Sequence, residues 1–346
     1  MTGALCFAAH PWVAVADTPG STYQIIRSDK VGETGGWDYV YADATHRRLY
    51  VPRGDRITVF NLDTLARTDT LSHTASVHGV AIDPASNHAF SSSQPLLMWD
   101  ATTLATIKSI PVQGSPDGIL FEPATERIYV LSHRAPNVTV LDAKDGSIVG
   151  TIDLGGAPEQ AQSDGAGLVF IDIEDRDQVA VIDAHSLKVL RKYDLNGKGG
   201  GPGALALNAK SRTLFVCCHD PATAIMLDAD TGAILGVLPI GKGVDAAEFD
   251  PDTMECFSSQ GDGTLTVIKE SEGRHFAVEQ TVATKVGART STLDQKTGHI
   301  FLATADFLPP PSVSAGAPAN GGPRRRRATV PGSFTLLEVG QPAPQP

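Results

Sequence analysis

Several familiar sequence signals are scarce or missing in this 346-residue chain. Its four cysteines show no CxxC or CxxCH spacing and no histidine pairing typical of a zinc site. Lysine and arginine number 28 against 39 acidic residues, so the formal charge is −11 and nucleic-acid binding is not expected. Beyond the first residues, no apolar run approaches the roughly 20 residues of a membrane-spanning helix. A G-x-S-x-G elbow and a P-loop are also absent, so no motif for nucleophilic catalysis is visible.

The composition that remains is that of a globular chain with many turns. Hydrophobic residues make up 41% and charged residues 19%, with 34 glycines and 23 prolines. We expect the cysteines to be buried thiols in strands, and a Cys218–Cys256 or Cys217–Cys218 disulfide stays open as an alternative.

The first residues bear on localisation. Residues 5–9 and 12–16 are apolar, and Ala14-Val15-Ala16 resembles the small-x-small site of a signal peptidase, although a basic segment before them is missing. We therefore expect residues 1–16 to be a truncated signal segment and the protein to be periplasmic or secreted. A cytoplasmic N-terminal tail is the alternative.

An internal repeat of about 40 residues is the strongest signal. Short apolar strands alternate with turn residues, and an acidic or amide residue closes the third strand of five units at Asn61, Asp100, Asp142, Asp183 and Asp228. These positions are 39, 42, 41 and 45 residues apart. Such a unit is too short to fold alone and must bury its faces against neighbouring units.

A second landmark sets the register. An acidic residue and proline precede the second strand at Asp83-Pro84, Glu122-Pro123 and Asp250-Pro251, and an aromatic residue follows each proline by six positions. Substituted versions keep that step in three more units, ending at Tyr50, Phe215 and Phe301. The fourth unit is weaker, with Gly165 followed by Val169. The count predicts seven units.

These units resemble the YVTN-type β-propeller repeat of YncE-like bacterial proteins. The residues that carry the resemblance are Gly114-Ser115-Pro116, Ile128-Tyr129-Val130 and Val138-Thr139-Val140-Leu141-Asp142-Ala143. It covers roughly residues 30–340 and implies an all-β fold, a seven-bladed propeller of four-stranded antiparallel blades. Propellers host both enzymes and binding proteins, so the repeat is weakly specific for function.

The ring of blades needs closing, since an open edge strand would pair with other chains. We predict that residues 23–27 form the outermost strand of the last blade and that residues 334–339 lie beside them. The propeller domain then covers residues 17–340, with a C-terminal tail at 341–346. Residues 307–331, which include Arg324 to Arg327, are predicted to be a long flexible loop.

The resemblance also implies where a site would lie, because in such blades the innermost first strand starts at one face of the propeller. The positions six residues before each turn proline or its equivalent therefore form a ring: Asp38, His78, Asp117, Glu159, Gly203, Asp245 and Arg289. Four carboxylates held close repel one another unless they are paired or bound to a metal. Asp38, Asp117, Glu159 and Asp245 are candidate ligands for Ca²⁺ or Mg²⁺, and His78 would allow Mn²⁺ or Zn²⁺. The alternative is that these residues cap local turns.

A second ring comes from the loops between strands two and three, at Arg53, Ser93, Ser132, Asp172, Cys218, Gln260 and Thr304. His133 and His219 each follow one of these positions and are, with His78, weak candidates for a general base. Arg53, Gln260 and Arg289 are candidate ligand-binding residues. Trp37 and Tyr39, beside Asp38, are a candidate aromatic wall for a ligand, and the alternative role of Trp37 is packing between blades.

Two functions remain open, and the sequence does not decide whether the protein is an enzyme. The first is an exported binding or scaffold protein that holds a small molecule, glycan or peptide at the polar mouth of its channel, as a monomer. The second is a metal-assisted, lactonase-like hydrolase or lyase with its site at the same mouth.

Overall fold

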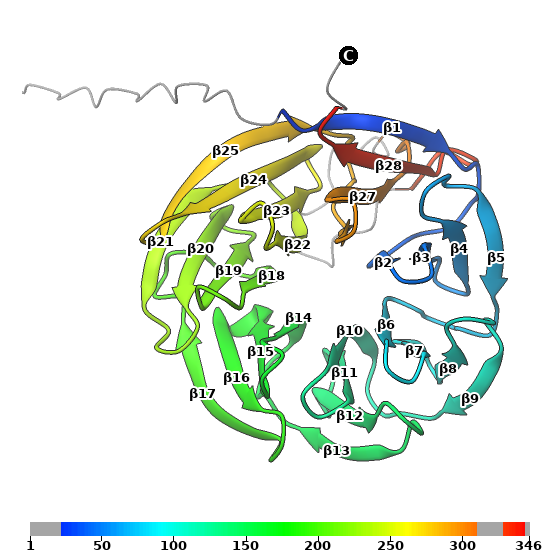
Figure 1. Ribbon diagram of the computed structural model, residues 1–346, viewed down its shortest axis with the longest axis horizontal. Helices are drawn as coiled ribbons and strands as arrows, with labels where there is room; N and C mark the ends of the chain where they lie inside the picture. The colour runs from blue at the N-terminus through cyan, green and yellow to red at the C-terminus, as the bar shows by residue number, and fades with distance from the viewer. Residues whose placement is uncertain (1–21, 310–327, 343–346) are drawn as a thin grey trace, which may run out of the picture.

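The protein is a seven-bladed β-propeller. The computed structural model describes residues 22–309 and 328–342, which form 28 strands in seven four-stranded antiparallel sheets around one axis (Figure 1). The predicted fold is therefore confirmed. The predicted signal segment, Cys6, the arginine run and the end of the tail lie outside the described residues. None of the residues in these two described ranges belongs to a helix with the length and apolarity needed to cross a bilayer.

The first four blades follow the chain in order, each running from an innermost to an outermost strand. Their strands are β2 (Tyr41–Asp43), β3 (Arg48–Pro52), β4 (Ile57–Asn61) and β5 (Arg67–Leu71); β6 (Val80–Asp83), β7 (His88–Ser91), β8 (Leu96–Asp100) and β9 (Thr106–Ile110); β10 (Pro116–Glu122), β11 (Arg127–Ser132), β12 (Val138–Asp142) and β13 (Ile148–Ile152); β14 (Pro158–Ser163), β15 (Leu168–Ile173), β16 (Gln178–Asp183) and β17 (Lys188–Asp194). A short 3₁₀ helix, η1 (Glu174–Arg176), follows β15.

The remaining three blades complete the ring. Their strands are β18 (Pro202–Asn208), β19 (Thr213–Cys218), β20 (Thr223–Asp228) and β21 (Ile234–Pro239); β22 (Val244–Asp250), β23 (Glu255–Gln260), β24 (Thr264–Ser271) and β25 (His275–Ala283); β26 (Ser291–Asp294), β27 (His299–Thr304), β28 (Thr335–Gly340) and β1 (Gln24–Lys30).

The acidic or amide residue that recurs at the end of the third strand in five blades caps the turn that follows. The carboxylate of Asp100 accepts hydrogen bonds from the backbone N–H groups of Thr102 and Thr103, at 3.0 and 2.6 Å. Asp228 holds the equivalent turn of blade five in the same way. A short side chain that accepts from the backbone two and three residues ahead stabilises such turns, so the repeat of this residue is structural.

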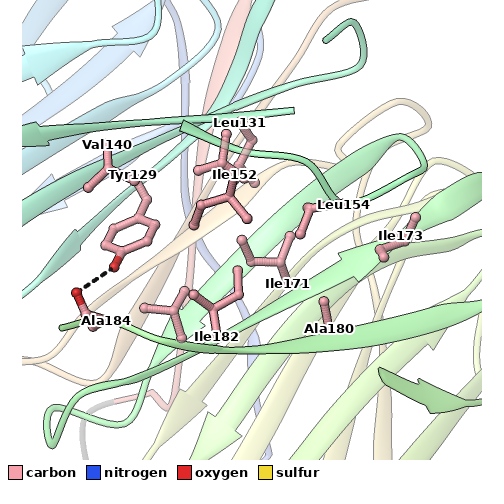
Figure 2. Close-up of a cluster of buried hydrophobic side chains, with 12 residues drawn as sticks. Tyr129, Leu131, Val140, Ile152, Leu154, Ile171, Ile173, Ala180, Ile182 and Ala184 are labelled. Atoms are coloured by element: carbon pink, nitrogen blue, oxygen red, sulfur yellow. Dashed lines mark hydrogen bonds between the residues drawn. The ribbon is translucent and has the colours of Figure 1, made fainter. Parts of the chain in front are cut away.

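The recurring aromatic residue of each second strand packs between neighbouring blades. Tyr129 lies in a buried cluster with Ile171 and Ile182 of the next blade, and its hydroxyl donates to the carbonyl of Ala184 at 3.4 Å (Figure 2). In the fourth blade this position belongs to Phe170, which is buried against blade five, and not to Val169. The turn before β15 is one residue shorter than its counterparts, which explains why the six-residue step failed there.

The ring closes through its two chain ends, as predicted. β1 pairs antiparallel with β28, from Gln24 opposite Gly340 to Lys30 opposite Thr335, and is the outermost strand of blade seven (Figure 1). The hydroxyl of Tyr23 donates to Glu255 of blade six at 2.7 Å. The closing strand is thereby tied to the neighbouring blade as well as to its own sheet.

Candidate functional site

The ring positions derived from the repeat lie together at one end of the channel. Each stands within the first two residues of an innermost strand or up to three residues before it. These innermost strands surround the axis in Figure 1. Because successive blades turn this position toward the same opening, side chains far apart in sequence come into contact.

Five side chains from blades one to four form one continuous series, here called the acid–histidine chain. Nδ1 of His78 lies 2.8 Å from Oδ2 of Asp38 and 3.3 Å from Oδ1 of Asp117. Nε2 of His133 lies 3.5 Å from Oδ2 of Asp117 and 2.8 Å from Oε2 of Glu159. Asp117 therefore stands in the middle, with one carboxylate oxygen toward each histidine.

Tyr39 lies across the channel at the same level. Its hydroxyl donates to Oε1 of Glu159, which joins blade one to blade four. Burial raises the pKa of Tyr39 well above its usual value, and the negative charges of Glu159, Asp245, Asp117 and Asp38 raise it further. The phenol therefore stays a neutral hydrogen-bond donor among four carboxylates.

Burial and pairing shift the pKa values of two residues of the acid–histidine chain. Burial raises the pKa of Asp117 to about 7; the charge of Glu159 adds to this effect, and that of His78 opposes it. The hydrogen bond to Glu159 raises the pKa of His133 to about 9, against the effect of burial. Pairing with Glu159 therefore favours the protonated form of His133, and burial beside Glu159 favours the neutral form of Asp117.

The other side of the ring is arranged differently. Nε of Arg289 lies 3.1 Å from Oδ2 of Asp245, so this carboxylate already has a cationic partner. Gly203 offers no side chain, and the imidazole of His219 occupies its place: a Cβ on Gly203 would lie 2.6 Å from Nε2 of His219. The ring thus contains an ion pair on blades six and seven and a histidine on blade five.

The acid–histidine chain contains two overlapping sets of potential metal ligands. The ligand atoms of Asp38, His78 and Asp117 all lie within 4.8 Å of one another, as do those of Asp117, His133 and Glu159. Each set combines two carboxylates with one imidazole, which suits Zn²⁺ or Mn²⁺ better than Ca²⁺. Of the four predicted ligands, Asp245 belongs to neither set.

Residues of the second ring hydrogen-bond to the backbone next to residues of the first ring. The hydroxyl of Ser132 accepts the N–H of Ser115 at 2.8 Å, and Oδ1 of Asp172 accepts the N–H of Gln160 at 2.6 Å. Both bonds hold segments beside ring residues. Oδ2 of Asp172 is buried without a hydrogen-bond partner in the described part of the chain, and burial raises the pKa of this residue.

Three candidate ligand-binding side chains are involved in packing. The guanidinium of Arg53 is buried 3.6 Å from the ring centroid of Phe334, and burial lowers its pKa to about 10. Gln260 is fully buried and donates to the carbonyl of Ser258. Trp37 packs against Phe334, at a centroid distance of 5.6 Å, in agreement with its alternative role between blades.

A cavity of about 780 Å³ extends along the axis from the ring. At the ring end, the cavity is lined by the residues that directly follow four of the ring positions: Tyr39, Gly79, Gly118 and Gln160. It continues past the inner strands to the turns at the opposite face, which include the exposed prolines Pro84 and Pro123. The cavity therefore has the polar ring and Tyr39 at one end and opens at the other, and its volume is that of a small-molecule site.

Two glutamines of β14 separate this cavity from blade five. Oε1 of Gln160 accepts the N–H of Leu205 at 3.1 Å, and its amide nitrogen donates to the carbonyl of Asp245 at 3.0 Å. The amide of Gln162 donates to the carbonyl of Leu205 at 2.8 Å. The wall is consequently built from the other six blades.

Sequence reasoning missed three features of this site. The sequence predicts Tyr39 as an aromatic surface only, and it does not predict the hydrogen bond of its hydroxyl across the channel. Gln160 and Gln162 were not singled out, and neither was Glu248, the carboxylate three residues past Asp245 that faces the cavity. Glu248 lies three residues after the ring position Asp245 on β22. The same count from the other six ring positions reaches no second acidic residue, so this step along the repeat identifies Glu248.

The cysteines need no special role. Cys217, Cys218 and Cys256 are buried free thiols, as expected, and burial raises the pKa of Cys217 to about 12. The described cysteines therefore contribute neither a disulfide nor a reactive thiolate.

Comparisons with known proteins define the fold and no more. No protein-family model matches the chain, and no curated protein is similar to it in sequence. The WD40 repeats of RRP9 superpose with a TM-score of 0.71 at 12% identity, covering 92% of this chain and 97% of that one. A chain of the mitotic checkpoint complex (TM-score 0.71, 13% identity, 87% and 95% covered) and U3-55K (0.71, 12%, 91% and 98%) are equally similar. The chain therefore shares the propeller fold of these structures.

Proposed function

We propose that the protein is a binding protein whose acid–histidine chain holds a divalent transition-metal ion at the polar mouth of the channel. One observation carries this proposal. Asp117 turns one oxygen to His78 and the other to His133, so two sets of nitrogen and oxygen donors share a single carboxylate. Close carboxylates cost several kcal/mol unless a cation neutralises them, and three carboxylates meet two histidines in the acid–histidine chain.

The small molecule that we propose as partner would reach this centre from the channel. The cavity adjoins the ring at Tyr39, and its volume suits a small molecule better than a folded peptide segment. The apolar residues 5–9 and 12–16 favour export, and the repeat favours membership of the YVTN-type propellers. Both of these rest on the sequence pattern.

Metal analysis of protein purified without chelator tests the proposal. We expect a stoichiometric divalent ion and, by calorimetry, Zn²⁺ or Mn²⁺ binding that Asp117→Asn weakens about ten-fold or more. Asp245→Asn is the matched control, because it removes a carboxylate from the same ring that is already paired with Arg289. Equal losses in the two variants, or no binding in the wild type, would contradict the assignment.

A second candidate function is metal-assisted hydrolysis at the same centre. It is favoured by Tyr39, whose neutral hydroxyl meets Glu159 beside one of the two ligand sets and could donate a proton to a leaving group. Lactone turnover by the metal-loaded protein that disappears in Tyr39→Phe, with metal binding unchanged, would establish this function over binding alone.

A further inference from the structure

The cavity below the ring contains a carboxylate that the fold leaves unpaired. Glu248 lies on β22, three residues past Asp245, or about 10 Å along a strand from the ring. In the described part of the chain its partly exposed side chain has neither a hydrogen bond nor an ion pair, and it lines the cavity. It is therefore separate from the acid–histidine chain.

The other charged groups of the cavity wall are already engaged. Asp43 accepts the N–H groups of Thr45 and His46 and contacts the imidazole of His46 at 2.8 Å. Asp164 pairs with Arg212 at 2.9 Å. Among the described residues, no lysine or arginine lines the cavity. Any positive charge that meets Glu248 must therefore come from a ligand.

The surroundings of Glu248 make its isolation costly. The same level of the other inner strands carries Ala81 and Leu120, and two polar side chains that are already bonded there. The hydroxyl of Thr292 accepts the N–H of Ala42 at 3.1 Å, and the amide of Gln162 donates to the carbonyl of Leu205. Burial alone raises the pKa of Glu248 to about 8. A carboxylate in such a wall is stabilised most by a bound cation that also donates hydrogen bonds.

We infer that the cavity is a binding site for an organic ammonium ion, with Glu248 as the carboxylate that pairs with it. A single carboxylate is a poor site for an inorganic divalent cation, because Ca²⁺ sites combine several protein oxygens and Mg²⁺ is held by carboxylates together with substrate phosphates. An ammonium group needs one carboxylate and further acceptors, and Tyr41, a cavity-lining residue, lies at the same level of blade one. The partly exposed side chains of Leu120 and Phe121 would receive the apolar body of the ligand.

Three probes of matched length test this assignment: n-hexylammonium, hexan-1-ol and hexanoate, titrated into the full-length protein by calorimetry. We expect hexylammonium to bind about ten-fold or more tightly than hexan-1-ol, and hexanoate not to bind, because the wall offers an anion no cationic partner. Glu248→Gln should weaken hexylammonium binding about ten-fold or more and leave hexan-1-ol within about two-fold of wild type. Glu272→Gln, in an exposed turn, is the matched control and should bind like wild type.

A second measurement uses the wild type alone, so it holds even where the variant does not fold. Ammonium binding ionises Glu248, so titrations at pH 7 in buffers of different ionisation enthalpy should report proton release with hexylammonium and none with hexan-1-ol. Unchanged hexylammonium binding in Glu248→Gln, binding of hexanoate, or the absence of proton release would overturn the inference. Zn²⁺ binding by Glu248→Gln should match wild type, so failure here leaves the proposed metal centre untouched, and the reverse also holds.

Discussion

Replacing Glu248 with glutamine should change how the stability of the propeller depends on pH. Burial raises the pKa of this carboxyl from 4.5 to about 8, so the folded protein holds a proton that the unfolded chain has already released. The stability of the wild type should therefore fall as the pH rises from 4.5 to 8 and then level off. The neighbouring groups Tyr41 and Cys256 also have raised pKa values, so they stay neutral over this interval.

The size of the effect follows from the same pKa difference. Each pH unit between the two values corresponds to about 1.4 kcal/mol, so the wild type should lose about 3 to 5 kcal/mol of unfolding free energy between pH 5 and pH 9 through this group. Glu248→Gln lacks that loss. The two proteins should be nearly equal in stability at pH 5, and the variant should be the more stable at pH 9.

Urea denaturation followed by tryptophan fluorescence, at unit steps from pH 5 to pH 9, measures the difference directly. Other titrating groups cancel when the two curves are subtracted, and Glu272→Gln should parallel the wild type throughout. Parallel curves for the wild type and Glu248→Gln would refute the reasoning. They would mean that cavity water solvates the carboxylate, and the proposed ammonium site would lose its energetic basis.

Two further predictions concern the propeller itself and are read from denaturant unfolding. Gly232→Ala should destabilise the fold by about 1–3 kcal/mol more than Gly197→Ala: both residues have positive φ, but only at Gly232 would the new Cβ meet a neighbour, 2.1 Å from the ring of Tyr193. Equal costs would show that Tyr193 moves aside freely. Tyr23→Phe should cost about 1–3 kcal/mol because it removes the buried bond to Glu255, whereas Tyr193→Phe, which loses a bond to the carbonyl of Ala229, should cost about 1 kcal/mol. A smaller loss at Tyr23 than at Tyr193 would argue against a contribution of the Glu255 contact to ring closure.

The sequence predicted the architecture well because the repeated residues are the ones that the architecture requires. Asp100 and its counterparts cap turns, and Tyr129 and its counterparts fill the space between blades, so their spacing reports blade number directly. The one misplaced aromatic, Phe170, follows a turn that is one residue shorter. A fixed step cannot detect such a deletion, whereas strand pairing does.

The sequence predicts where the site residues lie, but it does not predict which of their side chains contact one another. The register placed Asp117 and Glu159 at one end of the channel because it fixes the blade and the level of a residue. It does not fix how far a side chain reaches sideways. The contacts depend on the length and direction of each side chain. His133 contacts both Asp117 and Glu159, and the hydroxyl of Tyr39 bonds to Glu159 across the channel. Asp245 instead pairs with Arg289.

The two polar levels of the channel differ in a way that bears on function. In the ring, Asp38, Asp117 and Glu159 contact histidines and Asp245 contacts an arginine, so each carboxylate has a nitrogen partner within the fold. At the level of Glu248 the fold supplies no such compensation, and a glutamine or leucine there would cost less free energy. Residues that lower stability without an internal partner are expected where a bound molecule completes the arrangement. The uncompensated acid thus points to a ligand within the cavity, separate from the metal ion proposed for the ring.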